Sequence, residues 1–279
     1  MNWFQSVFFN FGVKRKKRKK INIDLTKRQR FVISVVILCL LLFVSESLFV
    51  KSGFFVAFGL SILTDLLLYW ANYQDIRTNL TRPLFILPFL FSLAFALFYF
   101  LIPARFLTRI LLTGLYGVGL YSMFLSQNIF TVASIRTIQL LSSAKTVSFF
   151  ITVVCYLFLS TVVLSLHASV FLIAILVFLF TFLLTTHSLW TYTLDTALFS
   201  HWQWALGISL CLFEIAFVIW FWPSNPKLIA IFLTGFFYAM IGLSHMWIDK
   251  RLFKGVLWEY IWLMAIVFFT LLLFTPWAS

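Results

Sequence analysis

The sequence predicts an all-α membrane protein: a polytopic helix bundle that crosses the bilayer about nine times, with its N-terminus in the cytoplasm. Of the 279 residues, 63% are hydrophobic and only 10% are charged, whereas roughly a quarter of the residues of a soluble domain are charged. A soluble chain needs polar side chains over its whole surface, but a chain solvated by lipid needs them only at helix ends and in internal sites. The solvent around most of this chain is therefore lipid.

Nine apolar segments follow one another, and each has about the twenty residues that a helix needs to span the bilayer core. They lie at residues 31–50, 53–71, 83–102, 106–126, 146–166, 168–187, 203–222, 227–247 and 257–275. Turn-forming residues separate several of them, such as Pro103 and the run from Pro223 to Pro226. Residues 146–187 are too long for one span, so a tight hairpin with His167 at its tip is predicted there.

The link between the fourth and fifth spans, residues 127–145, has a pattern of its own. Apolar residues such as Ile129, Val132 and Ile135 alternate with Ser, Thr and Arg136. This pattern predicts a short amphipathic helix along the inner membrane surface. An ordinary loop packed on the bundle is the alternative.

Residues 1–30 form a predicted cytoplasmic tail before the transmembrane domain at residues 31–279. Much of the net charge of +13 comes from one polybasic block: Lys14, Arg15, Lys16, Lys17, Arg18, Lys19 and Lys20. Apolar residues at helical spacing precede the block, so the tail is either an interfacial helix with a polybasic anchor or a flexible basic segment. The predicted partner of the block is an anionic lipid surface, at about 1 kcal/mol per cation, and not a nucleic acid.

The distribution of Lys and Arg predicts the orientation. With the N-terminus inside, all but four of the 21 basic residues fall on the cytoplasmic side. The four are Lys51, Arg105, Arg109 and Lys227. Since cytoplasmic loops of membrane proteins are enriched in Lys and Arg, the chain is expected in the inner (cytoplasmic) membrane with its N-terminus inside and its C-terminus outside.

Two acidic residues lie deepest within the predicted spans, and an ionisable group costs about 2.5–3.5 kcal/mol at a helix centre. Glu214 lies near the middle of the seventh span, and Asp65 lies closer to the inner end of the second. Because lipid offers Glu214 no partner, we expect its side chain to face the bundle. Both residues are candidates for binding a substrate or a proton, and a structural hydrogen bond between helices is the alternative.

A second group of polar residues falls near the inner face of the carboxy-terminal half. Its candidate metal ligands are His187, Asp195, His201, His245 and Asp249, and Glu259 at the start of the ninth span lies there as well. Imidazole and carboxylate groups are ligands for divalent metals, and a His with an acid one helical turn later is a workable pair. None of the five belongs to a metal motif such as HExxH, and such residues are also common at membrane interfaces. A metal or catalytic site here is a weak hypothesis, and no other cofactor is predicted.

Three functions fit these features. The leading hypothesis is a transporter or permease that moves or binds a small or lipidic substrate near Glu214 and Asp65. The second is an intramembrane enzyme that uses the histidines on a lipid-linked substrate at the cytoplasmic face, and the third is a non-catalytic membrane scaffold. The sequence contains no GxxxxGKS/T or GxGxxG loop, so a nucleotide-driven pump is not expected. The sequence leaves open whether the chain is an enzyme and which oligomeric state it has.

Overall fold

The computed structural model describes residues 26–48, 53–76, 82–102, 106–133, 139–194 and 201–276, which form helices and no strand. Nine of the described helices are long and apolar enough to cross a membrane. The elements are α1 (Lys27–Leu48), α2 (Gly53–Ala71), the short α3 (Tyr73–Ile76), the 3-10 turn η2 (Arg82–Phe85), α4 (Ile86–Leu101), α5 (Phe106–Ala133), α6 (Leu141–Ser165), α7 (Val170–Thr193), α8 (Trp202–Ile219), α9 (Pro226–Ile248) and α10 (Lys254–Phe274). The predicted all-α bundle is confirmed, and the chain is a multi-pass membrane protein.

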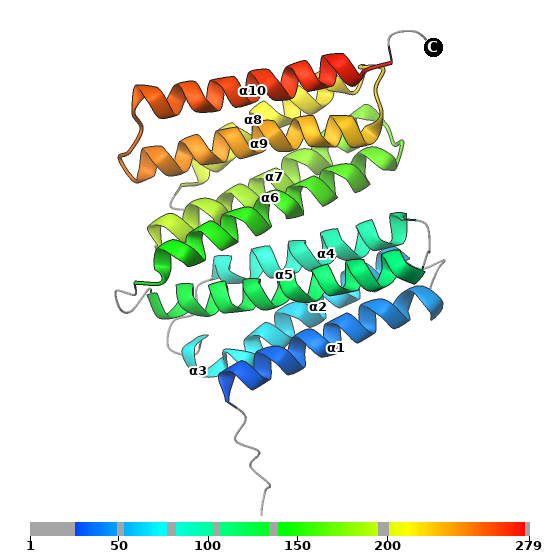
Figure 1. Cartoon of the computed structure of the whole chain (residues 1–279), viewed down its shortest axis with the longest axis vertical. Coiled ribbons are helices and arrows are strands. Elements are labelled where there is room, and N and C mark those ends of the chain that lie inside the picture. Colours follow the sequence, from blue (N-terminus) through cyan, green and yellow to red (C-terminus); the bar gives the residue numbers. More distant parts are fainter. Residues whose placement is uncertain are drawn as a thin grey trace, which may run out of the picture.

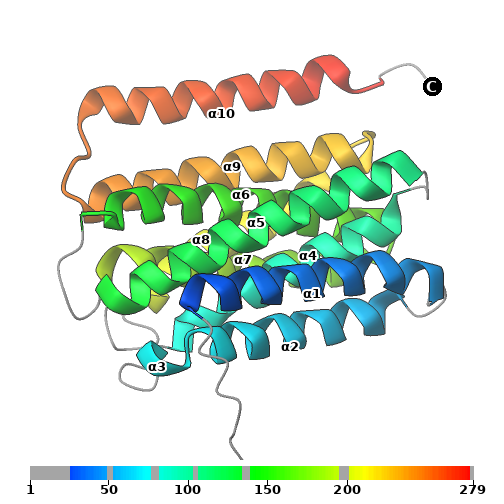
Figure 2. The same ribbon diagram turned by 60° about the horizontal axis from the view of Figure 1, so that its bottom comes forward.

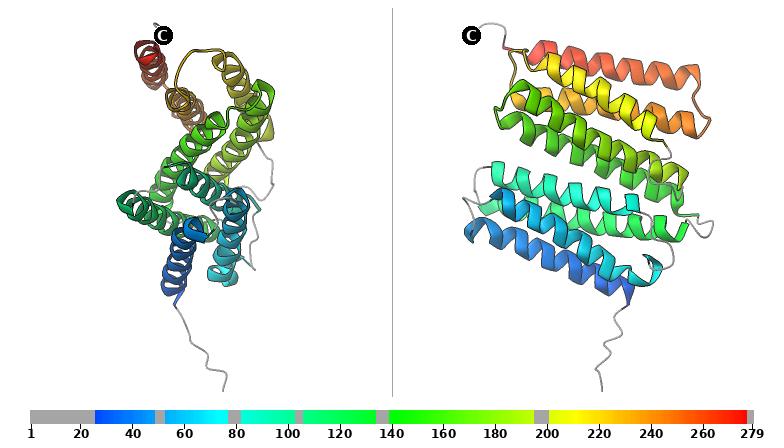
Figure 3. Two further views of the ribbon diagram at one scale, coloured as in Figure 1. Left: turned by 90° about the vertical axis from the view of Figure 1, so that its right-hand side faces the viewer. Right: turned by 180° about the vertical axis from the view of Figure 1, so that it is seen from behind.

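The long helices stand side by side in an elongated bundle (Figure 1). In the N-terminal half, residues 27–133, α1 packs on α2 and α5, and α2 packs on α4. In the C-terminal half, residues 141–274, α7 pairs with α8, and α9 packs on α6 and α10. The two halves meet at a seam where α6 packs against α4 and α5. The view along the helices places α6 near the centre of the bundle (Figure 3).

Aromatic side chains hold α6 on both of its sides. At the seam, Phe98 of α4 stacks on Phe158 of α6 with ring centroids 4.3 Å apart, and Phe95 meets the same ring edge-on at 5.1 Å. On the other side, Tyr156 stacks on Phe237 of α9 with centroids 3.9 Å apart. In lipid, van der Waals packing of this kind replaces exclusion of water as the force that joins helices.

The last span, α10, lies at the edge of the bundle and packs mainly on α9 (Figure 2). Two glycines of α9, Gly235 and Gly242, provide the contact surface. A Cβ atom at Gly235 would lie 2.8 Å from the Val267 side chain, and one at Gly242 would lie 2.5 Å from the Tyr260 hydroxyl. Because small residues let membrane helices approach closely, these glycines explain how a single neighbour holds α10.

The predicted hairpin within residues 146–187 is confirmed. α6 ends at Ser165, α7 begins at Val170, and His167 between them has a φ of 49°. This left-handed conformation is uncommon for a residue with a Cβ atom. The Nδ1 atom of His167 lies 2.9 Å from the Ser165 carbonyl oxygen, so the histidine side chain helps to close its own turn.

The predicted surface helix at residues 127–145 is wrong. α5 continues through the first part of this segment to Ala133, and α6 begins at Leu141. The C-terminal end of α5 is buried in the bundle, where the Phe130 ring packs edge-on against Trp190 of α7 with centroids 6.1 Å apart. Contact with α7 therefore extends α5 where the sequence pattern favoured a helix on the membrane surface.

Residues 1–25 of the predicted N-terminal tail lie outside the described residues, and they include the block from Lys14 to Lys20. Asp195 also lies outside them. Binding of the tail to anionic lipid, and the division between residues 1–30 and 31–279, therefore stay predictions.

Candidate functional site

A groove runs along the seam between the two halves. It encloses about 650 Å³, within the range of pockets that hold small molecules. The lining residues come from three helices: Phe91 and Phe95 of α4; Leu115, Val118, Gly119 and Ser122 of α5; Thr146, Val147, Phe150, Ile151, Val154 and Phe158 of α6. No charged residue is among them, so the groove suits an apolar ligand.

The shape of the groove depends on Gly119 of α5. A Cβ atom at this position would lie 2.5 Å from Cζ of Phe91, so the glycine leaves room for the Phe91 ring on the groove floor. The Phe91 ring also stacks on Tyr116, with centroids 6.1 Å apart and planes 9° from parallel. The Tyr116 hydroxyl lies 2.7 Å from Ser92 Oγ, which accepts a hydrogen bond from Thr64 at 2.9 Å. A buried polar chain thus holds the floor in place from behind.

The groove is open along one side and matches one leaflet in length. Val118 and Phe150 on its two edges are each 68% exposed. Along α6 it extends from Thr146 to Phe158, about 18 Å at 1.5 Å per helical residue, and half of a bilayer core is about 15 Å thick. The Ser122 and Thr146 hydroxyl groups lie toward one end, so the groove has an apolar length and a mildly polar end.

A polar layer lies at the C-terminal end of α7 and contains two buried histidines. His187 is fully buried, and its Nε2 atom lies 3.1 Å from Nε2 of Gln127 on α5. Because an amide nitrogen only donates, the imidazole Nε2 accepts this hydrogen bond. Within the described part of the chain, His187 Nδ1 and Gln127 Oε1 have no further partner. Each therefore retains capacity for one hydrogen bond to a ligand or water.

The second histidine, His245 of α9, is hydrogen-bonded to Ser188, the residue that follows His187 on α7. Its Nε2 atom lies 3.0 Å from Ser188 Oγ, and its ring stacks on Tyr192 with centroids 3.8 Å apart. Lys145 of α6 places its ammonium group 4.3 Å from the centre of the Tyr192 ring and donates a hydrogen bond to the Tyr192 carbonyl oxygen at 3.4 Å. These contacts join α6, α7 and α9 at one depth.

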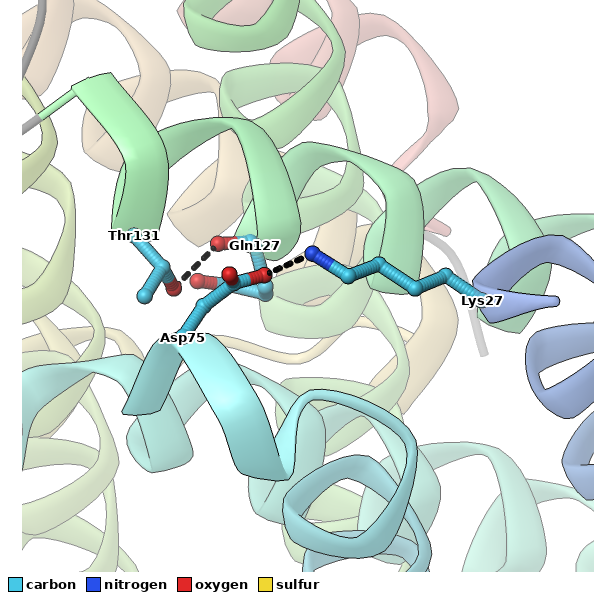
Figure 4. Close-up of polar contacts among 4 residues, drawn as sticks. All are labelled: Lys27, Asp75, Gln127 and Thr131. Atoms are coloured by element: carbon cyan, nitrogen blue, oxygen red, sulfur yellow. Dashed lines mark hydrogen bonds and ion pairs between the residues drawn. The ribbon is translucent and has the colours of Figure 1, made fainter. Parts of the chain in front are cut away.

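An ion pair closes the same end of the N-terminal half. Lys27 Nζ of α1 lies 2.7 Å from Asp75 Oδ2 of α3, next to the end of α5 that carries Gln127 and Thr131 (Figure 4). Thr131 Oγ1 donates to the Gln127 carbonyl oxygen at 2.9 Å. The polar layer therefore continues from the centre of the bundle to α1.

Comparison with known proteins identifies the family of this chain. Residues 29–274 match the family DUF5656, described as proteins of unknown function. The chain belongs to DUF5656. No curated protein and no solved structure matches it. The match begins in the first turn of α1 and ends with α10, so the groove and the polar layer, apart from Lys27, lie within the family region.

The position of Glu214 contradicts the expectation that its side chain faces the bundle. Its side chain is exposed on the outer side of α8. The residues that α8 buries lie on its other side: Ala205, Ile208, Ser209, Leu212, Ala216 and Ile219. A carboxyl group in lipid is unfavourable, but the Glu214 side chain still does not face the bundle of its own chain. A substrate path through the bundle at Glu214 is not compatible with this position.

Asp65 of α2 is only partly enclosed. It follows Thr64, which belongs to the buried polar chain behind the groove floor, and its side chain is half-buried. The Oδ1 atom has no hydrogen-bond partner within the described part of the chain. Asp65 is not among the residues that line the groove.

The described residues of the predicted metal group do not come together as ligands. Among the residues that the structure describes, no three His, Cys, Asp or Glu side chains are grouped so as to hold a metal ion. His187 and His245 bond Gln127 and Ser188, His201 is half-buried, and Asp249 is exposed. The sequence pointed to both buried histidines. It did not point to their partners, since polar residues such as Gln127 and Ser188 become partners only once α5, α7 and α9 are placed in space.

Proposed function

We propose that this protein binds a lipidic substrate through a single apolar chain laid in the α4–α5–α6 groove, as part of a transport function. The observation that carries this proposal is the groove itself, about 650 Å³ of space lined by apolar side chains and open at the side of the bundle. An opening at the side admits a ligand directly from the membrane, without passage through water. This is the entry that an apolar chain requires.

The dimensions of the groove support a ligand from one leaflet. Its length of about 18 Å suits one chain that extends from the membrane surface to the midplane, since the full core is about 30 Å thick. The Thr146 end lies near the start of α6, which the distribution of basic residues predicts to be cytoplasmic. The substrate therefore enters from the cytoplasmic leaflet, with its polar group near the Ser122 and Thr146 hydroxyl groups.

The position of the groove at the seam supports transport over passive binding. Many transporters work by movement of one bundle against another around a site at their interface. Here α6 of the C-terminal half forms one wall, and α4 and α5 of the N-terminal half form the others. Movement of the two halves would change the width of the groove and release the chain that it holds.

The proposal is tested by native mass spectrometry of the protein released from lipid nanodiscs. The wild type is expected to retain a lipid-like molecule, and Val118→Trp, which fills the open edge, is expected to lose it at least ten-fold. Leu111→Trp is the matched control, because Leu111 is an exposed apolar residue of the same helix that does not line the groove. Equal retention by Val118→Trp and the control would show that the groove does not bind the chain.

The proposed orientation has the N-terminus inside and the C-terminus outside the cytoplasmic membrane. It is supported by the count of nine spans among the described residues and by the concentration of Lys and Arg on one side. Alkaline phosphatase fused after Ser279 is expected to be active, and the same enzyme fused before Met1 is expected to be inactive. The reverse pattern would invert the topology and assign the groove to the outer leaflet.

A further inference from the structure

One side of α8 presents a carboxyl group to the lipid. Gly207, Cys211, Glu214 and Val218 follow at spacings of four, three and four residues, which places them on one side of a helix. All four are exposed, while the opposite side of α8 packs against α7 and α9. These four residues are called the Glu214 face below.

Lipid alone leaves the Glu214 face unsatisfied. A carboxyl group in the hydrocarbon region has no water to bond, and its placement there is unfavourable without a polar partner. The neighbouring exposed residues Leu210 and Val218 are apolar, and within the described part of the chain α8 packs mainly on α7 and α9, which lie behind it. The partner of Glu214 must therefore come from another molecule.

Among the described residues, Gly207 of this face makes no close helix contact within its own chain. A Cβ atom added at Gly207 would meet no atom within 4 Å, in contrast to Gly235 and Gly242, which admit the side chains of α10. Gly207 and Cys211 stand four residues apart, the spacing at which small residues let two membrane helices approach closely. The Glu214 face thus combines a polar group without a partner and a surface suited to close helix contact.

We propose that the Glu214 face is the contact between two copies of this chain, with α8 of one copy packed parallel to α8 of the other. The carboxyl groups of two copies at the same depth can share a hydrogen bond, so a second Glu214 is a direct complement for the first. A two-fold axis along the membrane normal, the commonest symmetry of protein oligomers, brings both copies of Glu214 to the same depth. A different partner would have to supply its own polar group at that depth.

The native cysteines report on this contact. Cys211 is exposed on the Glu214 face, whereas Cys155 is buried and Cys39 is partly buried. A parallel α8 pair brings the two Cys211 thiol groups close to the symmetry axis. Oxidation of the full-length protein in nanodiscs with copper phenanthroline is therefore expected to give a covalent dimer on a non-reducing gel, and Cys211→Ser is expected to abolish it.

Two substitutions separate the polar and the steric parts of the contact. Glu214→Leu and Gly207→Leu are each expected to lower the crosslinked fraction and the dimer peak in native mass spectrometry at least five-fold. Glu214→Gln is expected to retain the dimer, since an amide also donates and accepts. Gly114→Leu is the matched control, because a Cβ atom at Gly114 likewise meets no atom within 4 Å but lies on α5.

Each result decides for or against the dimer. A wild-type protein that is monomeric and gives no Cys211 crosslink overturns the proposal. A dimer that survives both Glu214→Leu and Gly207→Leu unchanged overturns it as well, because the contact would then lie elsewhere. Monomeric variants are checked for helix content by circular dichroism. Loss of the dimer with native helix content supports the Glu214 face, and a dimer lost equally in Gly114→Leu counts against it.

Discussion

The C-terminal end of α7 and the exposed side of α8 both have an ionisable side chain within or beside an apolar span, but they satisfy it in different ways. His187 is enclosed and hydrogen-bonded to Gln127, and His245 is bonded to Ser188. Glu214 is turned outward. The cause is the number of neighbours: α7 packs on α4, α6, α8 and α9, whereas α8 packs on α7 and α9. A central helix can bury a polar group, and a helix at the edge depends on a second molecule.

The largest effect is expected at the enclosed side of this comparison. His245→Ala removes the hydrogen bond to Ser188 and the ring that stacks on Tyr192. We expect it to lower the free energy of unfolding by about 2–4 kcal/mol, measured by unfolding in nanodiscs. His201→Ala, at a half-buried histidine, should cost less than about 1 kcal/mol. Equal losses would mean that the stacked histidine has no special role.

A double-mutant cycle sharpens the comparison at His187. Gln127→Leu leaves the buried imidazole without its partner and is expected to cost about 1–3 kcal/mol. Gln127→Leu combined with His187→Leu removes both partners, and we expect the double variant to lose less than the sum of the single variants. Additive losses, measured in the same unfolding assay, would contradict a direct Gln127–His187 interaction.

A smaller effect is expected at the Lys27–Asp75 ion pair. The Lys27 side chain is 44% exposed and that of Asp75 is 20% exposed, so water and salt screen the attraction. Lys27→Gln is therefore expected to cost less than about 1 kcal/mol, and the cost should decrease at high salt. A larger loss that does not depend on salt would show that the pair belongs to the enclosed polar layer.

The smallest effect on the single chain is expected at Glu214. Because its side chain is exposed, Glu214→Leu should change the free energy of unfolding of the monomer by no more than about 0.5 kcal/mol. The measurement is made at a protein concentration where native mass spectrometry shows monomer only. A loss comparable with that of His245→Ala would mean that Glu214 has a partner within its own chain and would remove the contrast between the two regions.

Apolar length was a sufficient guide to the spans but not to their neighbours. The hairpin at His167 followed from a stretch too long for one span, and the structure confirms it. The prediction for residues 127–145 was wrong because it relied on pattern and not on length. A mixed polar and apolar pattern is produced both by a surface helix and by a buried helix end. Gln127 and Thr131 are polar and yet buried, since their partners lie on the same helix and on α7.

The apolar groove was not predicted at all. Its lining residues, such as Phe91, Gly119 and Phe150, resemble any other apolar residues in a sequence that contains 37 Phe. What distinguishes them is a gap between α5 and α6, and this gap depends on how three helices pack. The same limit applies to Gly119, whose importance appears only when Phe91 is seen against it.

The sequence by itself determined the membrane class, the succession of nine spans and the presence of ionisable groups at given depths, because these properties depend on the solvent and on chain length. Only the tertiary structure decided which side of each helix meets protein and which meets lipid. Hydropathy cannot make that decision, because a lipid tail and a buried leucine are equally apolar surroundings. For this reason the helix that carries Glu214 could be predicted from the sequence, and the outward direction of its side chain could not.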